Sequence, residues 1–257
     1  MPVYDRIGRG YASHRCADLR IVESIIERAG IPADANVADI GAGTGNYSRA
    51  LADRGWRIAA VEPSGVMRRQ ADAHPGVEWI AAAAEALPIA DGSVQAAICI
   101  LAAHHFTSLP DAIREMGRIV GAGSVLWLTF DPRAGTSPWL ADYFPDIWAE
   151  AHRVFPVLHS VCNLFWTYAG RRVEIETWLV PQDLRDCFLA AGWRNPAIYL
   201  EASMRAGMSA FALADQERVN RGLRRLERDV SDGSWQRRYG HLLEQDAIDW
   251  GYRFLRA

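Results

Sequence analysis

A short strand followed by three closely spaced glycines restricts the fold of this chain more than any other feature. Residues 37–40 are mostly apolar, as in a buried strand, and a helix is expected to begin at Asn46. Between them stand Gly41, Gly43 and Gly45. Glycine permits left-handed backbone and lets a ligand lie against bare main chain. In an open parallel sheet such a turn lies at the carboxyl end of a strand, where ligands bind.

Strands and helices alternate along the first half of the chain. Apolar residues at helical spacing predict a helix over residues 18–29, which Gly30 and Pro32 end. Further strands are expected at residues 57–61, 77–81, 96–101 and 124–130, and helices at 46–54, 64–73 and 110–120. This alternation predicts an α/β fold, with a parallel sheet covered by helices on both faces.

The pattern changes after Asp131. Residues 131–180 are rich in aromatic side chains, and we interpret this segment as an insertion over the active face of the sheet. The alternative is that the rings pack a small core of the insertion itself. Beyond it, the pattern predicts helices over residues 181–191 and 219–230, and strands near 193–200 and 248–255.

Composition excludes several classes of function. All 28 cationic side chains are arginine, which rules out Schiff-base chemistry on a lysine and the phosphate-binding lysine of P-loop proteins. The net charge of -3 does not favour a nucleic-acid partner. The four cysteines are widely spaced, so we expect no metal site and a reducing cytosol. Neither a signal peptide nor a membrane-spanning run is visible, so a cytoplasmic protein without a membrane partner is expected.

Two acidic residues mark the ends of the first two strands. Asp39 lies at the glycine turn, and Glu62 ends the second strand. The glycine spacing G-x-G-x-G is one residue shorter than the dinucleotide-binding fingerprint, and Asp39 would repel a pyrophosphate. Glu62 would accept hydrogen bonds from ribose hydroxyls. Together these features favour a nucleoside with a positively charged amino-acid tail, which is the chemistry of S-adenosylmethionine.

Four blocks of the sequence, in the same order, resemble class I S-adenosylmethionine-dependent methyltransferases, in particular the bacterial UbiE-type small-molecule group. The blocks are VADIGAGTGNYSRAL (37–51), VEPSGVMRRQA (61–71), AEALPIADGSVQAAICILAAHHF (84–106) and REMGRIVGAGSVLWLTFDP (114–132). The resemblance implies a Rossmann-like, seven-stranded, mostly parallel sheet. We expect one domain over residues 1–257, with residues 1–30 as an N-terminal helical lid and residues 131–180 as the aromatic-rich cap after the fifth strand.

The resemblance also implies roles for single residues around the cofactor. Gly41, Gly43 and Gly45 would pass close to its methionine part. Asp39 would orient the loop or meet the ammonium group, and Glu62 would bind the ribose.

Five further residues would hold the adenine and the sulfonium. Pro63 and Met67 would pack on the adenine. Ala84 would offer its backbone N–H to the ring, and Glu85 would lie near the exocyclic amine. Leu101 would lie beside the sulfonium through its backbone.

The N-terminal stretch resembles a tyrosine-rich lid that covers the cofactor in this family. Tyr11 and Arg15 are one helical turn apart and can share a face. Arg15 is the candidate for a fork-shaped contact with the cofactor carboxylate, and Tyr4 or Tyr11 for a cation–π contact with the sulfonium. The alternative is an ordinary surface arginine beside packing tyrosines.

His104 and His105 follow the fourth strand, beside the expected reaction centre. With Tyr11 they are the catalytic candidates, because a histidine can accept a proton from an acceptor near neutral pH. A structural role for the two histidines is the alternative.

We expect a methyltransferase that acts on a small, partly apolar molecule. Two other functions stay open. One is a cyclase that closes the aminocarboxypropyl arm of S-adenosylmethionine into a four-membered cyclic amino acid and releases methylthioadenosine. The other is a non-catalytic S-adenosylmethionine binder. The oligomeric state is left open as well.

Overall fold

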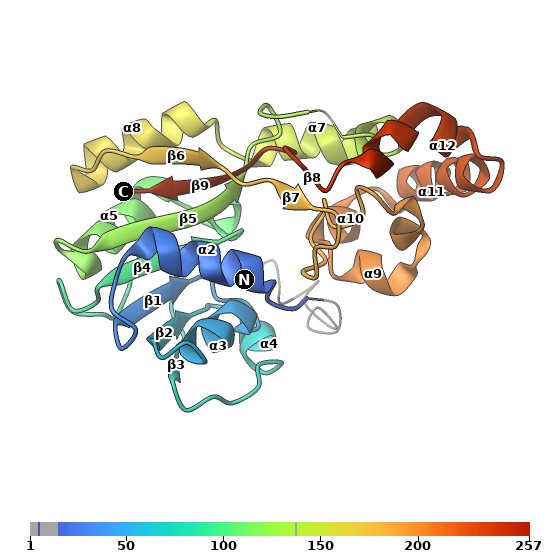
Figure 1. Ribbon diagram of the computed structural model, residues 1–257. Helices are drawn as coiled ribbons and strands as arrows, with labels where there is room; N and C mark the ends of the chain where they lie inside the picture. Colours follow the sequence, from blue (N-terminus) through green and yellow to red (C-terminus); the bar gives the residue numbers. More distant parts are fainter. Residues whose placement is uncertain (1–4, 6–14, 137) are drawn as a thin grey trace.

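The computed structural model describes residue 5, residues 15–136 and residues 138–257. Its centre is a seven-stranded sheet in the order β3-β2-β1-β4-β5-β9-β6 (Figure 1). Strands β1 to β5 pair in parallel, and β9 pairs antiparallel with both β5 and β6. The predicted Rossmann-like, mostly parallel sheet is therefore confirmed. The strands are β1 (Asn36–Ile40), β2 (Arg57–Val61), β3 (Val77–Ile80), β4 (Ala96–Ile100), β5 (Ser124–Phe130), β6 (Glu174–Thr177) and β9 (Tyr252–Arg256).

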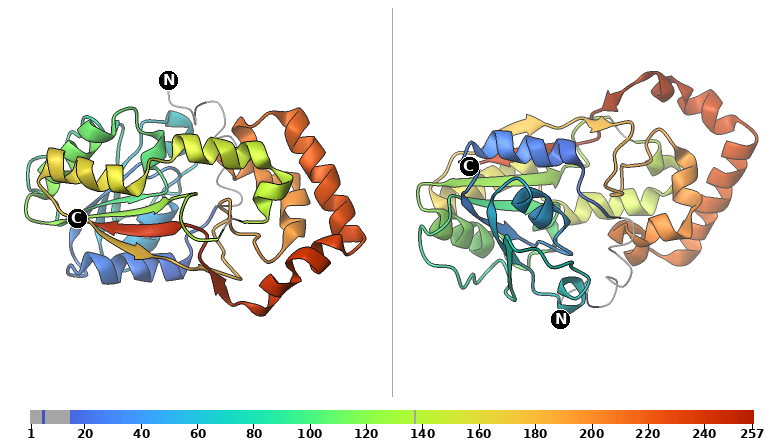
Figure 2. Two further views of the ribbon diagram at one scale, coloured as in Figure 1. Left: turned by 90° about the horizontal axis from the view of Figure 1, so that it is seen from above. Right: turned by 60° about the horizontal axis from the view of Figure 1, so that its bottom comes forward.

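Helices cover both faces of this sheet (Figure 2). On one face lie α2 (Leu19–Ala29) and α3 (Asn46–Ala52), and on the other lie α5 (Leu109–Val120) and α8 (Leu158–Ala169). Neighbouring strand residues belong to different cores, since Val37 packs on the α2 side and Ala38 on the α5 side. Successive side chains of a strand point to opposite faces, so a strand buried on both is apolar throughout.

The N-terminal helix α2 packs on the sheet. Ile21, Val22 and Ile25 are fully buried, and the Asp18 side chain caps the helix by accepting a hydrogen bond from the Arg20 N–H. Residues 19–29 of the expected lid are thus part of the sheet-covering layer. The part of the lid that precedes Arg15 lies outside the described residues, apart from Asp5.

A helical cap extends beyond the carboxyl edge of the sheet (Figure 1). Trp139 lies at its centre, with ring centroids 5.7 Å from Tyr143, 5.5 Å from Tyr199 and 5.5 Å from Trp235. Most cap aromatics therefore build a core of the cap itself. Its elements are α6 (Leu140–Tyr143), α7 (Pro145–Val154), η3 (Pro196–Leu200), α9 (Ala202–Ala206), α10 (Ser209–Leu213), α11 (Gln216–Ser231), α12 (Ser234–Tyr239) and η4 (Gly240–Glu244), where η marks a 3-10 helix.

Part of the segment 131–180 belongs to the sheet layers and not to the cap. Helix α8 packs so closely on α5 that a Cβ on Gly117 would lie 2.9 Å from the Cβ of Ala169. Strand β6 pairs with β9 at the sheet edge. Most of the cap comes instead from residues 138–154 and 196–244. Aromatic content alone does not distinguish residues of the sheet layers from residues of the cap, because large rings pack in the cores of both.

Three predictions for the second half of the chain are wrong. Where a helix was expected over residues 181–191, Pro181 ends β7 (Val180–Pro181) and residues 182–191 form turns and bends, because side chains such as Asp186 bind distant segments and fix an irregular backbone. Residues 193–200 contain η3 instead of a strand; it begins at Pro196, which cannot donate to a sheet. The single last strand is divided into β8 (Ala247–Ile248), which pairs with β7, and β9.

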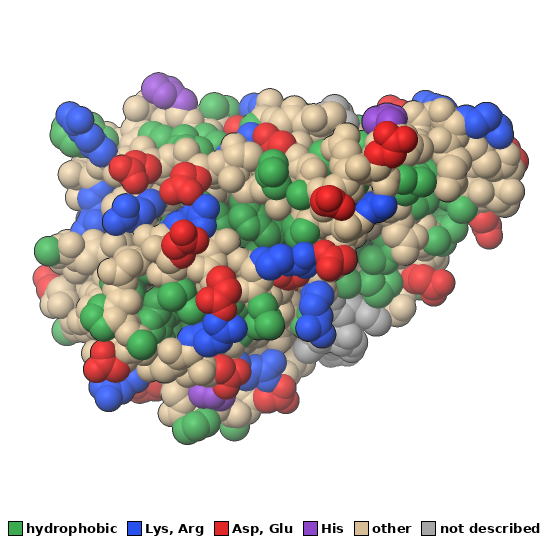
Figure 3. All heavy atoms as spheres, viewed as in Figure 1, with side chains coloured by type: hydrophobic (Ala, Val, Ile, Leu, Met, Phe, Trp, Pro, Cys, Tyr) green, Lys and Arg blue, Asp and Glu red, His purple; other side chains and the backbone are tan. Residues whose placement is uncertain are grey.

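Charged side chains are mixed on the surface. On the face in Figure 3, arginine and acidic side chains lie beside one another instead of gathering by sign. Ion pairs such as Arg20 with Asp183 and Arg218 with Asp146 contribute to this pattern. In the part of the chain that the structure describes, no helix has the length and apolar character needed to cross a membrane.

Candidate functional site

The turn between β1 and α3 accepts only glycine at two of its positions. Gly41 has φ of +78° and Gly45 has φ of +75°, a backbone region that other residues rarely adopt. A Cβ on Gly41 would lie 2.5 Å from the Cβ of Ala102, and one on Gly45 would lie 2.7 Å from the ring of Trp79. The Gly41 N–H donates to the Val61 carbonyl at 2.9 Å. The glycines thus let this turn pack against the ends of β2 and β4.

Glu62 joins the glycine turn to the turn after β2. Its Oε2 accepts a hydrogen bond from the Gly43 N–H at 3.0 Å, and its Oε1 accepts one from the Ser64 N–H at 2.8 Å. The side chain is buried, and this burial raises its pKa. Each carboxylate oxygen keeps a further lone pair, so Glu62 can still accept hydrogen bonds from hydroxyl groups of a ligand.

A first cavity, of about 340 Å³, lies over these turns at the carboxyl ends of β1, β2 and β4. It brings together residues that are far apart in the sequence. The predicted site residues that line it are Arg15, Gly41, Gly43, Glu62, Pro63, Met67, Ala84, Glu85, Leu101 and His105. Of the other described site residues, Asp39 and Gly45 line neither this cavity nor the second.

A second cavity, of about 710 Å³, lies between the sheet edge and the cap. Aromatic rings form one of its walls. The ring centroid of Phe130 lies 5.1 Å from that of Phe155 and 5.0 Å from that of Tyr252, which in turn lies 4.7 Å from Phe188. The aliphatic part of the lining is Ile147, Ala151, Val154, Leu189, Met208, Ala210, Leu213 and Ala214.

Two acidic residues that line the second cavity have partners within the protein. Asp146 lies 2.6 Å from Arg218, and Glu150 accepts a hydrogen bond from Arg153 at 2.8 Å. Their charges are balanced locally. A third acidic residue of the lining, Asp215, caps α11 by accepting a hydrogen bond from the Arg218 N–H at 3.0 Å. The lining of the second cavity is thus mainly apolar, with three acidic side chains that are bonded within the protein.

Arg15, Leu101 and His105 line both cavities, which therefore adjoin one another. Leu101 follows β4 with φ of +52°, the one positive φ among the non-glycine residues that the structure describes. Its N–H donates to the Leu128 carbonyl at 2.8 Å, which holds this backbone in place. Backbone in such a region is costly and clusters at functional sites.

Comparison with known proteins identifies the family of this architecture. The family described as "Methyltransferase domain" matches residues 38–128. A solved structure, described as a putative methyltransferase from an antibiotic biosynthesis pathway of Anabaena variabilis, is 48% identical in sequence. The match covers 95% of this chain and 98% of that chain, with a TM-score of 0.92. This chain belongs to the S-adenosylmethionine-dependent methyltransferases.

Two curated relatives match a shorter part of the methyltransferase. The ubiquinone/menaquinone biosynthesis C-methyltransferase UbiE of Rubrivivax gelatinosus is 30% identical over 137 residues, which are 52% of this chain and 52% of that protein. The malonyl-[acyl-carrier protein] O-methyltransferase of Pseudescherichia vulneris is 30% identical over 127 residues, 49% of this chain and 51% of that protein. The chain thus spans about half the length of these curated relatives.

Asp39 of the methyltransferase is bound inside the fold. Its carboxylate accepts a hydrogen bond from the Ser48 hydroxyl of α3 at 2.6 Å, and burial raises its pKa to about 6. Of the two roles expected for Asp39, this geometry favours orientation of the loop over contact with an ammonium group.

Glu85 lines the first cavity, and its carboxylate also accepts hydrogen bonds from a neighbouring loop. Its Oε1 accepts hydrogen bonds from the Thr107 N–H at 2.6 Å, the Thr107 hydroxyl at 2.8 Å and the Ser108 N–H at 3.1 Å. This oxygen is committed to the loop after η2 (Ala103–His105). The expected contact with the exocyclic amine of adenine stays a prediction.

His104 and His105 lie in η2, next to the junction of the cavities. Their ring centroids are 3.8 Å apart, and the His104 ring lies 4.2 Å from that of Phe155. Burial lowers the pKa of His105 to about 4, and burial together with His105 holds the pKa of His104 well below its usual value. Both imidazoles are therefore neutral at neutral pH.

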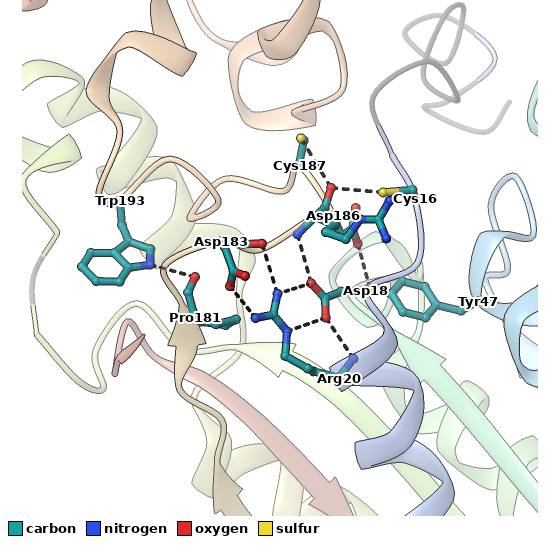
Figure 4. Close-up of polar contacts among 10 residues, drawn as sticks. Cys16, Asp18, Arg20, Tyr47, Pro181, Asp183, Asp186, Cys187 and Trp193 are labelled. Carbon is teal, nitrogen blue, oxygen red and sulfur yellow. Dashed lines mark hydrogen bonds and ion pairs between the residues drawn. The ribbon is translucent and has the colours of Figure 1, made fainter. Parts of the chain in front are cut away.

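Arg15 makes an ion pair that the sequence did not predict. Its Nε and Nη2 both contact the carboxylate of Asp186, the second at 3.0 Å. The Tyr47 hydroxyl donates to the same carboxylate at 2.9 Å (Figure 4). Asp186 and Tyr47 also line the first cavity. In the sequence, Asp186 is one of two aspartates within residues 181–191, and nothing in this local pattern indicates that it pairs with Arg15.

Tyr11 lies outside the described residues, so its predicted roles in cofactor binding and catalysis stay predictions. Within residues 5, 15–136 and 138–257, no group of three or more His, Cys, Asp or Glu side chains is arranged to hold a metal ion.

Proposed function

We propose that this methyltransferase transfers the methyl group of S-adenosylmethionine, bound in the first cavity, to a small, partly apolar molecule bound in the second cavity. The observation that carries the proposal is the shared boundary of the two cavities at Arg15, Leu101 and His105. Methyl transfer needs the acceptor atom in line with the methyl group and the sulfur, at about 3–3.5 Å. Adjoining cavities would allow this arrangement, and the cap would help to exclude water.

The lining of the first cavity supports an assignment of roles along the cofactor. Glu62 would hold the ribose hydroxyls, with Pro63 and Met67 against the adenine. The exposed main chain of Gly41 and Gly43 would face the methionine part. With these parts placed, the sulfonium would lie near Leu101, where the second cavity begins.

The second cavity favours an acceptor with an apolar ring or chain. Phe130, Phe155, Phe188 and Tyr252 offer ring faces and edges for stacked or edge-on contacts. Asp146 and Glu150 are paired with arginines of the protein, and Asp215 accepts a hydrogen bond from the Arg218 N–H, so the larger part of the surface offered to an acceptor is apolar. One curated relative is named a C-methyltransferase and another an O-methyltransferase, so the relatives do not assign the acceptor atom.

His105 would accept the proton of an acceptor that must lose one. It lines both cavities, whereas His104 lines the second. Its imidazole is neutral at neutral pH, which is the form that a general base requires.

The test is to incubate the purified chain with S-adenosylmethionine, with and without fractions of a small-molecule extract, and to follow the products by mass spectrometry. We expect S-adenosylhomocysteine only when a fraction supplies an acceptor, together with a product one methylene heavier. Methylthioadenosine formed without any acceptor would indicate ring closure of the aminocarboxypropyl arm instead. Tight binding without turnover in any fraction would indicate a non-catalytic binder.

A further inference from the structure

Asp186 is a buried carboxylate in a loop that has both exposed and buried residues. It lies between β7 and η3 and is 1% exposed, while Asp183 and Arg185 nearby are exposed. A buried charge is costly unless it is paired and hydrogen-bonded. The contacts of Asp186 therefore explain why this loop is irregular where a helix was expected.

The partners of Asp186 come from two distant segments. The Arg15 guanidinium contacts it as a fork through Nε and Nη2, and the Tyr47 hydroxyl adds a third hydrogen bond. Arg15 belongs to the segment before α2, and Tyr47 to the first turn of α3, directly after the glycine turn. The Arg15 carbonyl also accepts a hydrogen bond from Asn46 Nδ2 at 2.8 Å. Arg15 is thus fixed through both its side chain and its main chain.

These residues lie at one end of the first cavity. Arg15, Asn46, Tyr47 and Asp186 all line it, beside the glycine turn. If Glu62 binds the ribose of the cofactor, the end of the cavity at Arg15 and Asp186 lies near the amino-acid part. A fixed guanidinium there suits a carboxylate, because its planar fork binds carboxylates in two parallel hydrogen bonds.

We propose that Asp186 is a positioning residue that holds the Arg15 guanidinium at this end of the first cavity, where Arg15 binds the carboxylate of S-adenosylmethionine. The inference rests on the proposed function, since it requires the cofactor in the first cavity. A direct contact between Asp186 and the cofactor ammonium is the competing explanation. The observed geometry favours positioning, because both oxygens of Asp186 are already bonded to Arg15 and one of them to Tyr47 as well.

Further contacts join the start of α2 to the loop that carries Asp186 (Figure 4). Asp18 accepts a hydrogen bond from the Arg185 N–H at 3.0 Å, and Arg20 bridges Asp18 at 2.7 Å and Asp183 at 2.5 Å. Asp183 does not line either cavity. Two aspartates of the loop therefore pair with arginines: Asp186 with Arg15 at the first cavity, and Asp183 with Arg20 outside it. The second pair is a matched control for the first.

The experiment compares three ligands by calorimetry on the full chain: S-adenosylhomocysteine, its decarboxylated analogue and methylthioadenosine. Asp186→Asn should weaken S-adenosylhomocysteine about tenfold to a hundredfold, the range of a charge-assisted hydrogen bond. The other two ligands lack the carboxylate, so their Kd should change less than about twofold. Asp183→Asn, which breaks the outer pair, should leave all three Kd values unchanged.

Tyr47→Phe keeps both charges and removes one hydrogen bond to Asp186. It should weaken S-adenosylhomocysteine a few-fold with the same selectivity among ligands, so the inference stays testable if Asp186→Asn does not fold. Thermal unfolding of each variant checks the fold.

Three results would overturn the inference. Equal weakening of all three ligands would mean a general structural role for Asp186. Weakening of the decarboxylated analogue together with S-adenosylhomocysteine would mean a direct contact with the ammonium group. Unchanged or tighter binding of S-adenosylhomocysteine would mean that Arg15 needs no positioning by Asp186. Failure of the unmodified chain to bind S-adenosylhomocysteine would instead contradict the proposed function itself.

Discussion

The two cavities adjoin at three residues, yet their walls differ in origin. The first cavity is lined at the carboxyl ends of β1, β2 and β4 by turns whose main chain lies close to the ligand space, as at Gly41 and Gly43. The second cavity is lined by side chains from the strand ends, α7, the loop near Phe188 and α10. A wall of main chain changes little when side chains change, whereas a wall of side chains is altered by each substitution. This division suits one constant cofactor and a specific acceptor.

The titratable groups of the two cavities differ in the same way. Buried acids stand beside the first cavity, and burial raises the pKa values of Asp39 and Glu62. Half-buried histidines lie beside the second cavity and at its junction with the first, and burial lowers the pKa values of His104 and His105. Burial disfavours the charged form in both cases, so acids and bases shift in opposite directions.

The largest effect is expected from Gly41→Ala, which alters the main-chain wall itself. The new Cβ would lie 2.5 Å from the Ala102 Cβ, at a φ of +78°. Strain and overpacking of this kind cost about 1–3 kcal/mol each, so S-adenosylhomocysteine should bind about a thousandfold more weakly by calorimetry. Gly30→Ala is the control, since Gly30 has φ of +60° with nothing within 4 Å of its Cβ position. Wild-type affinity in Gly41→Ala would contradict a ligand site at this turn.

His105→Gln tests the junction of the cavities. If His105 is the general base, its loss should lower kcat about a hundredfold with the acceptor from the extract assay, while the Kd of S-adenosylhomocysteine changes little. The unmodified enzyme should show no loss of kcat from about pH 8 to about pH 5, because the pKa of His105 is lowered to about 4. His159→Gln, at an exposed position, is the control. If kcat is unaltered in His105→Gln, His105 is not the general base, and a structural role for this histidine is the remaining explanation.

The same contrast explains what the sequence could and could not predict. Gly43 and Glu62 are 19 residues apart and follow adjacent parallel strands, so periodicity and glycine spacing placed them together. Arg15 and Asp186 are 171 residues apart, and no local pattern links them. The stretch around Asp186 has apolar residues at helical spacing, as a helix would, yet long-range contacts override that preference. The sheet and the first cavity were therefore accessible to sequence analysis, and the cap and its cavity largely were not.

Ala210→Trp tests the side-chain wall alone. Ala210 lies on α10 and lines the second cavity but not the first. An indole there should displace the acceptor and lower kcat/KM about thirtyfold, without changing the Kd of S-adenosylhomocysteine. Ala212→Trp is a matched control on the same helix, because Ala212 is exposed. Equal losses in both variants, or a parallel loss of cofactor affinity, would contradict an acceptor site in the second cavity.

The smallest effect concerns pH and stability, and its sign should differ between Asp39 and His105. The pKa of Asp39 is raised to about 6, so the folded state takes up a proton before the unfolded state does. Acidification from about pH 7 to about pH 5 should therefore add about 1 kcal/mol to the free energy of unfolding through this group. The pKa of His105 is lowered to about 4, so the unfolded state takes up the proton first. The same acidification should remove about 2 kcal/mol through His105.

Urea unfolding at the two pH values separates these contributions. Asp39→Asn removes the stabilising contribution, so this variant should lose more stability on acidification than the unmodified chain. His105→Gln removes the destabilising contribution and should lose less. Opposite deviations from the unmodified chain would assign the raised pKa to Asp39 and the lowered pKa to His105. Deviations of the same sign would mean that burial does not shift these two pKa values in opposite directions.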